Sequence, residues 1–300
     1  MYDGVINVYK EKGYTSHDVV AKMRGILKQK KVGHTGTLDP DAEGVLPVCL
    51  GQGTKLCDML TDKNKTYRAV LLLGRKTDTQ DISGKVLEEQ TVLAGEEEVR
   101  AAVMSFVGPY NQIPPMYSAL KVNGRKLCDL AREGQVIERK ARPVTIYSIE
   151  IEKIELPRVI MTVTCSKGTY IRTLCEDIGE KLACGGCMEG LLRTATGGFL
   201  LKDSRKLAEI EALQNEGRLG EIISAVDEVL SVYPALLINS EQGDKLVHNG
   251  NPFYPDMASA GDYREMPVRV YDMAGKFIGI YQYREEKHWF QPQKIFAGGQ

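Results

Sequence analysis

One acidic residue, Asp39, stands out because of the short segment around it. It follows the run GHTGT (residues 33–37) and Leu38, and Pro40 comes directly after it. Such an aspartate can be a turn residue, since its carboxylate accepts hydrogen bonds from nearby backbone amides. It can also be a carboxylate held rigidly toward a ligand, because proline restricts the backbone beside it. The spacing alone leaves both interpretations open.

Two other segments carry more polar and aromatic side chains than core packing requires. Residues 112–124 read QIPPMYSALKVNG, and residues 166–172 read SKGTYIR. In the second segment Arg172 falls at the start of a predicted helix, where a cation is unfavourable because of the helix dipole. An anionic group should therefore lie near Arg172, and an aspartate from another loop would provide it.

Other possible sites have weaker signals. The glycines between residues 33 and 53 invite comparison with a phosphate-binding loop, but no GK[ST] or GxGxxG pattern accompanies them. Cys184 and Cys187 form a lone CxxC pair, and none of the four histidines belongs to an HxxxH or HExxH pattern. A zinc site needs further ligands at suitable spacing, so we predict no metal site.

The 300-residue chain has the composition of an ordinary globular protein, and its length corresponds to about two domains. Seven cysteines without a disulfide framework indicate a reducing compartment. No apolar run is long enough to span a bilayer, and the first residues, MYDGVINVYK, lack the pattern of a signal peptide. We therefore expect a cytoplasmic protein that does not contact a membrane.

Charge is unevenly distributed, although the formal net charge is only −1. Residues 19–38, which overlap the glycine-rich run, contain no acidic side chain but several basic ones: Lys22, Arg24, Lys28, Lys30 and Lys31. A basic stretch of this kind is most often the solvated face of a helix. It also has the charge expected of a surface that binds nucleic acid.

Hydrophobic periodicity predicts a mixed α and β chain. We expect strands over residues 4–9, 45–50, 65–74, 144–156 and 159–165. We expect helices from Thr15 or Ser16 to Leu27, over residues 99–106, and from a Thr169 cap to residue 182. From residue 232 onward, short strands and a hairpin turning at residues 272–275 indicate a β domain of a size that can fold alone. The predicted domains are residues 1–231 and 232–300.

Four long motifs, in a fixed order, resemble one known family. GHTGTLDPDAEGVLPVCLGQGTK is followed by KTYRAVLLLGRKTDTQDISG, then QIPPMYSALKVNGRKL, then CSKGTYIRTLCEDIGEKL. Together they resemble the bacterial tRNA pseudouridine synthases of the TruB type, which modify uridine 55 in the T loop, over most of residues 4–200. The tail is similar to a PUA-type RNA-binding domain, through HNGNPF and the closing hairpin.

The resemblance implies an α+β pseudouridine synthase fold. Its central sheet would be mixed but mainly antiparallel and flanked by helices, and a small β-rich PUA-like domain would follow. Asp39 would be the nucleophile, and Arg172 would pair with it and keep it ionised. Tyr67 would stack on the uracil and help to take the proton from C5.

The resemblance also implies which residues bind the substrate. His34 would fill the space that the flipped-out base leaves, and Tyr170 and Leu191 would line the base pocket. Lys10 and Lys121 would contact the RNA, and Arg125 and Lys126 would hold phosphates. The expected partner is the T arm of tRNA, bound by a monomer without any metal or organic cofactor.

Three other functions remain open. One is a non-catalytic RNA-binding protein of the same fold, against which the intact set of Asp39, Tyr67 and Arg172 argues. Another is a guide-RNA-dependent synthase, which would normally carry extra basic extensions that this sequence does not show. The third is a nucleotide-using enzyme with GHTGT as its phosphate loop.

Overall fold

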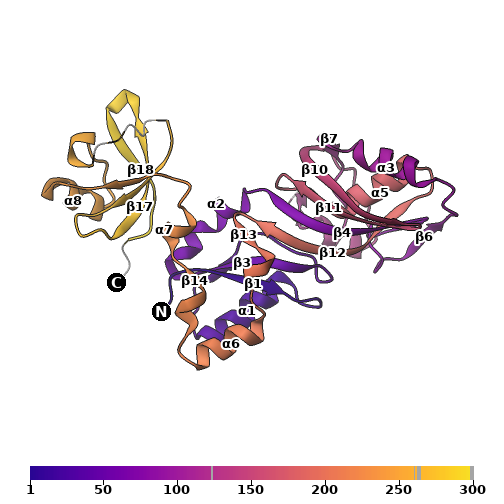
Figure 1. Cartoon of the computed structure of the whole chain (residues 1–300), viewed down its shortest axis with the longest axis horizontal. Coiled ribbons are helices and arrows are strands. Elements are labelled where there is room, and N and C mark those ends of the chain that lie inside the picture. Colours follow the sequence, from indigo (N-terminus) through magenta and orange to yellow (C-terminus); the bar gives the residue numbers. More distant parts are fainter. Residues whose placement is uncertain (123, 260, 262–264, 298–300) are drawn as a thin grey trace.

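The computed structural model describes residues 1–122, 124–259, 261 and 265–297. A large sheet and a four-stranded sheet lie in different parts of an elongated molecule (Figure 1). The large sheet contains β1 (Gly4–Lys10), β2 (Val32–His34), β3 (Glu43–Leu50), β4 (Lys65–Leu73), β7 (Gly108–Gln112), β10 (Arg142–Glu155), β11 (Arg158–Cys165), β12 (Gly186–Thr196), β13 (Phe199–Leu200) and β14 (Ile223–Ser224). The smaller sheet contains β15 (Ala235–Leu237), β16 (Val268–Tyr271), β17 (Phe277–Arg284) and β18 (Trp289–Ile295).

Two short hairpins and the helices complete the secondary structure. The hairpins are β5 (Arg75–Thr77) with β6 (Val86–Glu89) and β8 (Lys121–Val122) with β9 (Arg125–Lys126). The helices are α1 (Ser16–Leu27), α2 (Cys57–Thr61), α3 (Glu96–Met104), α4 (Leu127–Arg132), α5 (Ile171–Lys181), α6 (Leu207–Asn215), α7 (Val226–Val229) and α8 (Glu241–His248). Within the described ranges, no helix is long and apolar enough to cross a bilayer.

The large sheet is mixed, with one parallel pair at its centre. Its strands follow the order β14-β1-β3-β12-β4-β11-β10-β7, while β2 pairs with β3 and β13 pairs with β12. All these pairs are antiparallel except β3 with β12, which are parallel. The predicted α+β class with a mainly antiparallel mixed sheet and a β-rich C-terminal part is confirmed.

The predicted strands lie within about two residues of the observed ones, because their apolar periodicity matches their burial. In β4 the alternation buries Tyr67, Ala69 and Leu71 on one face, as expected. Helix α1 is capped by Thr15, whose side chain accepts from the amide of Asp18 while the Asp18 carboxylate accepts from the amide of Thr15.

The predicted cap of the third helix is wrong. Tyr170 is the cap residue of α5, and it provides no side-chain hydrogen bond. The hydroxyl of Thr169 donates instead to the carbonyl of Ser166, 2.9 Å away, within the preceding turn. A local turn contact therefore takes the side chain that the sequence pattern assigned to the helix.

Two apolar cores support the two halves of the large sheet. Helices α1 and α6 pack on β1 and β3, and helices α3 and α5 pack on β4, β10 and β11 (Figure 1). Strands β1 and β3 are buried along almost their whole length. The centre of the sheet, where β3, β12 and β4 meet, is thus held between two rigid halves.

The four-stranded sheet shares a core with the large sheet. Val5 and Cys49 from the large sheet, with Leu56 and Leu60 nearby, form one buried cluster with Ile280 and Phe296. Around this cluster Lys55 donates to the carbonyl of Ile295 and Lys294 donates to the carbonyl of Lys55, both at 2.7 Å. The C-terminal part therefore depends on this contact for some of its apolar burial.

The predicted hairpin at residues 272–275 is present between β16 and β17. One Asp272 oxygen accepts from the amides of Ala274 and Lys276, and the other lies 3.1 Å from Nε2 of His248. His248 is also 3.7 Å from Asp244, so these three side chains tie α8 to the hairpin. The backbone amide of Met273 donates to one carboxylate oxygen of Asp244, and that of Ala274 donates to one carboxylate oxygen of Asp272.

Phe296→Ala should destabilise the whole chain by about 3–5 kcal/mol, the usual cost of removing a buried phenylalanine. Denaturant unfolding followed by fluorescence and circular dichroism measures this cost. Leu237→Ala is the matched control, since Leu237 is exposed and its truncation should change stability by less than about 0.5 kcal/mol. A separate early transition of the C-terminal part alone would contradict a shared core.

Candidate active site

The loop of residues 35–42 joins β2 to β3 and carries Asp39. Leu38 is buried in the core, and its backbone amide donates to the hydroxyl of Ser16, 2.9 Å away. The carbonyl of Pro40 accepts from the amide of Gly13 at 2.9 Å, and the amide of Ala42 donates to the carbonyl of Asp39. The backbone is therefore fixed on both sides of Asp39.

Lys10 is completely buried beneath this loop. Its ammonium donates to the carbonyls of Ala42 at 2.5 Å, Pro40 at 3.0 Å and Glu11 at 3.3 Å. Burial lowers the pKa of Lys10 to about 8, so the side chain is still largely protonated at neutral pH. The side chain of Lys10 has no exposed surface and holds the loop, so a contact of Lys10 with RNA stays a prediction.

Arg172, at the start of α5, lies beside Asp39. Its Nε is 3.0 Å from one carboxylate oxygen of Asp39, and its Nη2 is 3.4 Å from the other. The Asp39 side chain is 41% exposed, whereas that of Arg172 is only 6% exposed. The anion expected beside Arg172 is thus Asp39, and the pair presents one carboxylate to the outside.

The guanidinium of Arg172 is itself fixed by three further contacts. It donates to the carbonyls of Tyr117 at 2.8 Å and Thr79 at 3.1 Å, and it lies 3.8 Å from a carboxylate oxygen of Asp81. Segments 78–81 and 117 are far from residue 172 in the sequence. The geometry of the Asp39 pair is therefore set by three separate parts of the chain.

Burial and neighbouring charges both act on the pKa of Asp39. Burial raises the pKa of its carboxyl above the usual range, the Arg172 cation opposes that rise, and Asp81 adds to it. Asp81 was not among the residues singled out from the sequence. It lies in the motif KTDTQDISG, but only the fold brings its charge near Asp39.

Aromatic and apolar side chains lie near the pair. Tyr67 on β4 is buried in the same core as Leu38, and Leu191 on β12 packs against that core. Tyr170 precedes Arg172, and its backbone amide and carbonyl are both bonded by the side chain of Gln112. Burial raises the pKa of Tyr67 and of Tyr170, which favours their neutral forms.

His34 lies at the end of β2, just before the Asp39 loop. Its Nδ1 is 3.2 Å from the carbonyl of Gly36, and its ring meets that of His17 edge to face at 5.2 Å. Burial lowers the pKa of His34, and the electrostatic interaction with the neighbouring His17 ring lowers it further. The ring is therefore a neutral, half-buried group beside the site.

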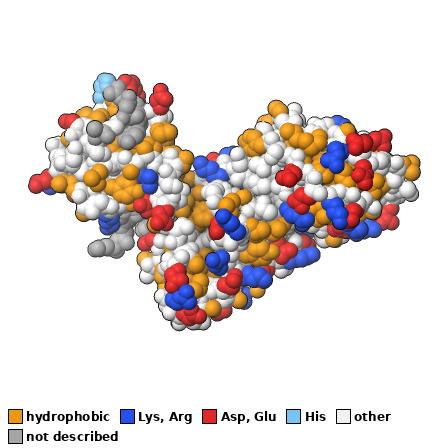
Figure 2. All heavy atoms as spheres, in the orientation of Figure 1, with side chains coloured by type: hydrophobic (Ala, Val, Ile, Leu, Met, Phe, Trp, Pro, Cys, Tyr) orange, Lys and Arg blue, Asp and Glu red, His pale blue; other side chains and the backbone are white. Residues whose placement is uncertain are grey.

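The predicted phosphate-binding residues lie on exposed structure. Lys121 and Lys126 pair across the β8–β9 hairpin and are exposed, while Arg125 forms an ion pair with Glu133. The basic side chains of residues 22–31 are exposed as well. Figure 2 shows the face of the molecule hollowed between the four-stranded sheet and the end that carries α3 and α5, with lysine and arginine side chains on its floor.

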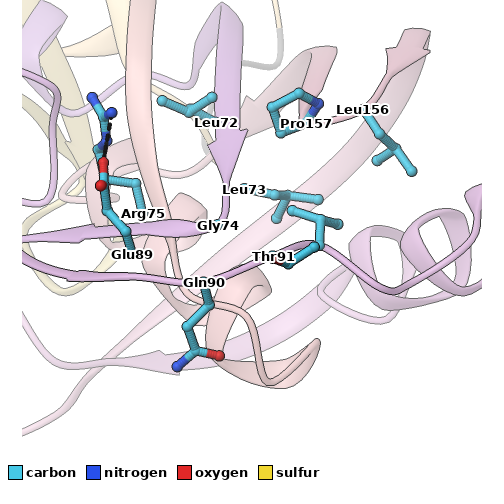
Figure 3. Close-up of a pocket in the computed structure, with 10 residues that line it drawn as sticks. Leu72, Leu73, Gly74, Arg75, Glu89, Gln90, Thr91, Leu156 and Pro157 are labelled. Carbon is cyan, nitrogen blue, oxygen red and sulfur yellow. Dashed lines mark hydrogen bonds and ion pairs between the residues drawn. The ribbon is translucent and has the colours of Figure 1, made fainter.

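A separate recess lies at the far end of β4. It is lined by Leu72, Leu73, Gly74, Arg75, Glu89, Gln90, Thr91, Val92, Leu156 and Pro157 (Figure 3). Arg75 and Glu89 form an exposed ion pair there at 2.7 Å. At about 3.3 Å per strand residue, Leu72 is about 17 Å along β4 from Tyr67. The recess is therefore not part of the Asp39 site.

Two family models match the chain. The N-terminal domain of the TruB family pseudouridylate synthases matches residues 24–171, and the tRNA pseudouridylate synthase B C-terminal domain matches residues 172–231. The chain belongs to the TruB family of pseudouridylate synthases. It is an enzyme of the pseudouridine synthase class, and Asp39 and Arg172 fall in regions that these models cover.

Curated relatives of this TruB family chain agree over nearly its full length. The protein of Lachnoclostridium phytofermentans is 52% identical over 98% of this chain and 99% of its own. Those of Alkaliphilus oremlandii and Bacillus cereus are 48% and 40% identical, over 95% and 99% of this chain and 95% and 98% of their own. Each of the three is named tRNA pseudouridine synthase B.

Solved structures share the fold at lower identity. A chain of a Cbf5-Nop10-Gar1 complex has a TM-score of 0.74 and 26% identity, over 98% of this chain and 85% of its own. A chain of an H/ACA RNP bound to a substrate RNA containing 2′-deoxyuridine has a TM-score of 0.73 at 24% identity, with the same coverage. The TruB family chain thus has the pseudouridine synthase fold.

Arg172→Met should lower the single-turnover rate at least about 100-fold, because Asp39 loses its counter-charge and its orientation. Arg172→Lys should recover only part of that loss, since lysine keeps the charge but not the planar donor pair. Circular dichroism and the unfolding midpoint check that both variants are folded. A folded Met variant with a rate near that of the wild type would show that the ion pair is not needed.

Asp81→Asn should move the acid limb of kcat/KM to lower pH. The negative charge of Asp81 raises the pKa of Asp39, so its removal lets Asp39 ionise at lower pH. Asp78→Asn is the control, because Asp78 lies in the same loop but its carboxylate bonds to the amide of Lys85. An unmoved acid limb in Asp81→Asn would contradict the charge coupling.

Proposed function

We propose that this enzyme isomerises uridine to pseudouridine in the T loop of tRNA, at position 55. The observation that carries the proposal is the partly exposed carboxylate of Asp39, held by a buried Arg172 at the end of a rigid loop. The names of its relatives support tRNA as the substrate. The chain is 40–52% identical to those proteins but only 24–26% identical to the chains from the H/ACA RNP and the Cbf5-Nop10-Gar1 complex. This difference favours direct modification of tRNA over a guide-dependent reaction.

Asp39 is the proposed nucleophile. The reaction breaks the bond between N1 of uracil and C1′ of ribose, turns the base and rejoins it through C5. Uracil is a poor leaving group, so a carboxylate beside the base assists by forming a covalent or ion-paired intermediate. The reaction transfers no electrons and no external group, which is why we propose that it needs no metal or organic cofactor.

The other side chains have supporting roles in this proposal. Tyr67 stacks on the uracil, Tyr170 and Leu191 line the base pocket, and His34 fills the space that the base vacates. Extrusion of the base costs a few kcal/mol, which the enzyme recovers through contacts with the RNA. Lys121, Arg125, Lys126 and the basic residues near α1 hold phosphates, and the PUA-like C-terminal domain, residues 232–300, adds affinity. The enzyme acts as a monomer.

Asp39→Asn should abolish isomerisation and leave binding of the T arm within about tenfold, or 1.4 kcal/mol. Asparagine has almost the same shape and can still act as a turn residue, but it lacks the nucleophilic oxygen. Because pseudouridine has the mass of uridine, the assay follows tritium release from C5-labelled uridine in a T-arm stem-loop. Binding is measured by titration at a fixed salt concentration.

Asp41→Asn is the matched control. Asp41 is two residues away, exposed and 3.9 Å from Lys12, and an exposed pair of this kind contributes little, so the rate should stay within about threefold. Release of tritium by folded Asp39→Asn at the wild-type rate would make Asp39 a turn residue. A stem-loop with cytidine at position 55 tests the position, since it should yield no pseudouridine.

A further inference from the structure

Arg193, on β12, lies between the two strands that flank the active site. It pairs in register with Tyr67 on β4 and with Gly44 on β3. Residues in register on neighbouring strands project from the same face of a sheet, so the side chains of Arg193 and Tyr67 are neighbours. Gly44 allows this close approach, because a Cβ there would lie 2.3 Å from the carbonyl oxygen of Arg193.

The guanidinium of Arg193 is buried and incompletely paired. The side chain is 1% exposed, and its Nε donates to the carbonyl of Val45 at 2.7 Å. Its Nη2 is buried and has no hydrogen-bond partner, and no carboxylate among the described residues forms an ion pair with it. A buried cation without a counter-ion is costly, so a negative charge that arises nearby during the reaction would be stabilised by it.

The titratable groups around Arg193 leave few sources for that charge. Lys10 on β1, Lys65 on β4 and His34 on β2 all feel its charge, and each is either positive or neutral. Cys165 on β11 stays a thiol, because burial raises its pKa to about 11. The carboxylates of Asp39 and Glu43 also act electrostatically on this cluster, but neither forms an ion pair with Arg193 among the described residues. Tyr67 is the neutral neighbour of Arg193 that can become an anion, and Arg193 opposes the rise that burial causes in its pKa.

We propose that Arg193 is a positioning residue that orients the Tyr67 hydroxyl and stabilises its phenolate while that oxygen takes the proton from C5. In this step the C5–H bond breaks and its electron pair forms the C5=C6 double bond. The electron pair of the C6=N1 bond moves to N1, and N1 takes a proton from water. Tyr67, which became a phenol when it took the C5 proton, returns that proton to solvent. The inference rests on the proposed function, since it concerns the last step of the isomerisation.

The alternative is that Arg193 only braces β3 against β12 through Val45. A bracing role predicts that every step of the reaction slows alike when Arg193 is replaced. The proposed role predicts a loss confined to removal of the C5 proton. The two are therefore separated by a substrate that has no proton at C5.

The test compares two T-arm stem-loops, one with tritiated uridine and one with 5-fluorouridine at the target. Fluorine replaces the departing proton, so that base can detach and rejoin through C5 without the proposed step. With uridine, Arg193→Met should slow single-turnover tritium release about 10- to 100-fold, part of the ~10²–10⁴-fold that a positioned proton acceptor contributes. With 5-fluorouridine, chromatography of nuclease digests should show rearrangement within twofold of the wild-type rate.

The pH dependence provides a second readout. Removal of the Arg193 charge raises the pKa of Tyr67, so the rate of tritium release should rise at higher pH in Arg193→Met than in the wild type. Arg193→Lys keeps a cation, so its pH profile should lie between those of the wild type and Arg193→Met. The Lys variant also replaces the Met variant in the test if the Met variant does not fold. An equal loss on both substrates, or a loss that does not change with pH, would overturn the proposal.

Arg269→Met is the control for removal of an arginine that donates to backbone carbonyls away from the Asp39 site; its side chain is half-buried. Arg269 lies on β16 and donates to the carbonyls of Tyr233 and Asp227. Its loss should lower the unfolding midpoint and change the rates on both substrates by the same factor. If the wild-type enzyme rearranges neither stem-loop, the proposed function fails; if it rearranges both and Arg193→Met does so equally well, the inference alone fails.

Discussion

The carboxylate of Asp39 can face the exterior because buried cations hold the groups behind it. Arg172 bonds the carboxylate itself, and Lys10 bonds the carbonyls of Pro40 and Ala42 in the same loop. Buried charges are unfavourable unless they are paired, so each of these cations limits the conformations that the loop can adopt. The cost of burying them is offset by the two apolar cores that support the sheet on either side.

The mixed sheet brings these groups together at its centre. The parallel pair of β3 and β12 joins a half built on α1 and α6 to a half built on α3 and α5. Asp39 comes from the first half, whereas Tyr67 and Arg172 come from the second. The site therefore forms at the seam between two cores, where strands that are distant in the sequence lie side by side.

The C-terminal sheet is linked to the same framework. Ile280 and Phe296 pack with Val5 and Leu56 in one buried cluster, so the C-terminal sheet has a defined position relative to the strands that carry the Asp39 loop. An RNA that contacts both sheets would meet a surface whose two parts are already oriented. Preorganisation of this kind reduces the entropy lost on binding.

Short-range patterns in the sequence were enough to predict most of the local elements and the candidate residues for chemistry. Residues close together in the sequence are enough to predict the alternation in β4, the apolar stripe and cap of α1, and the unfavourable cation at the start of α5. The motifs around Asp39 and Arg172 pointed to the family. Three features could not be predicted in this way: the burial of Lys10 beneath the loop, the charge of Asp81 beside Arg172, and the pairing of Arg193 with Tyr67. Burial and Coulomb interactions depend on distances between segments far apart in the sequence, and those distances are fixed only when the strands pair.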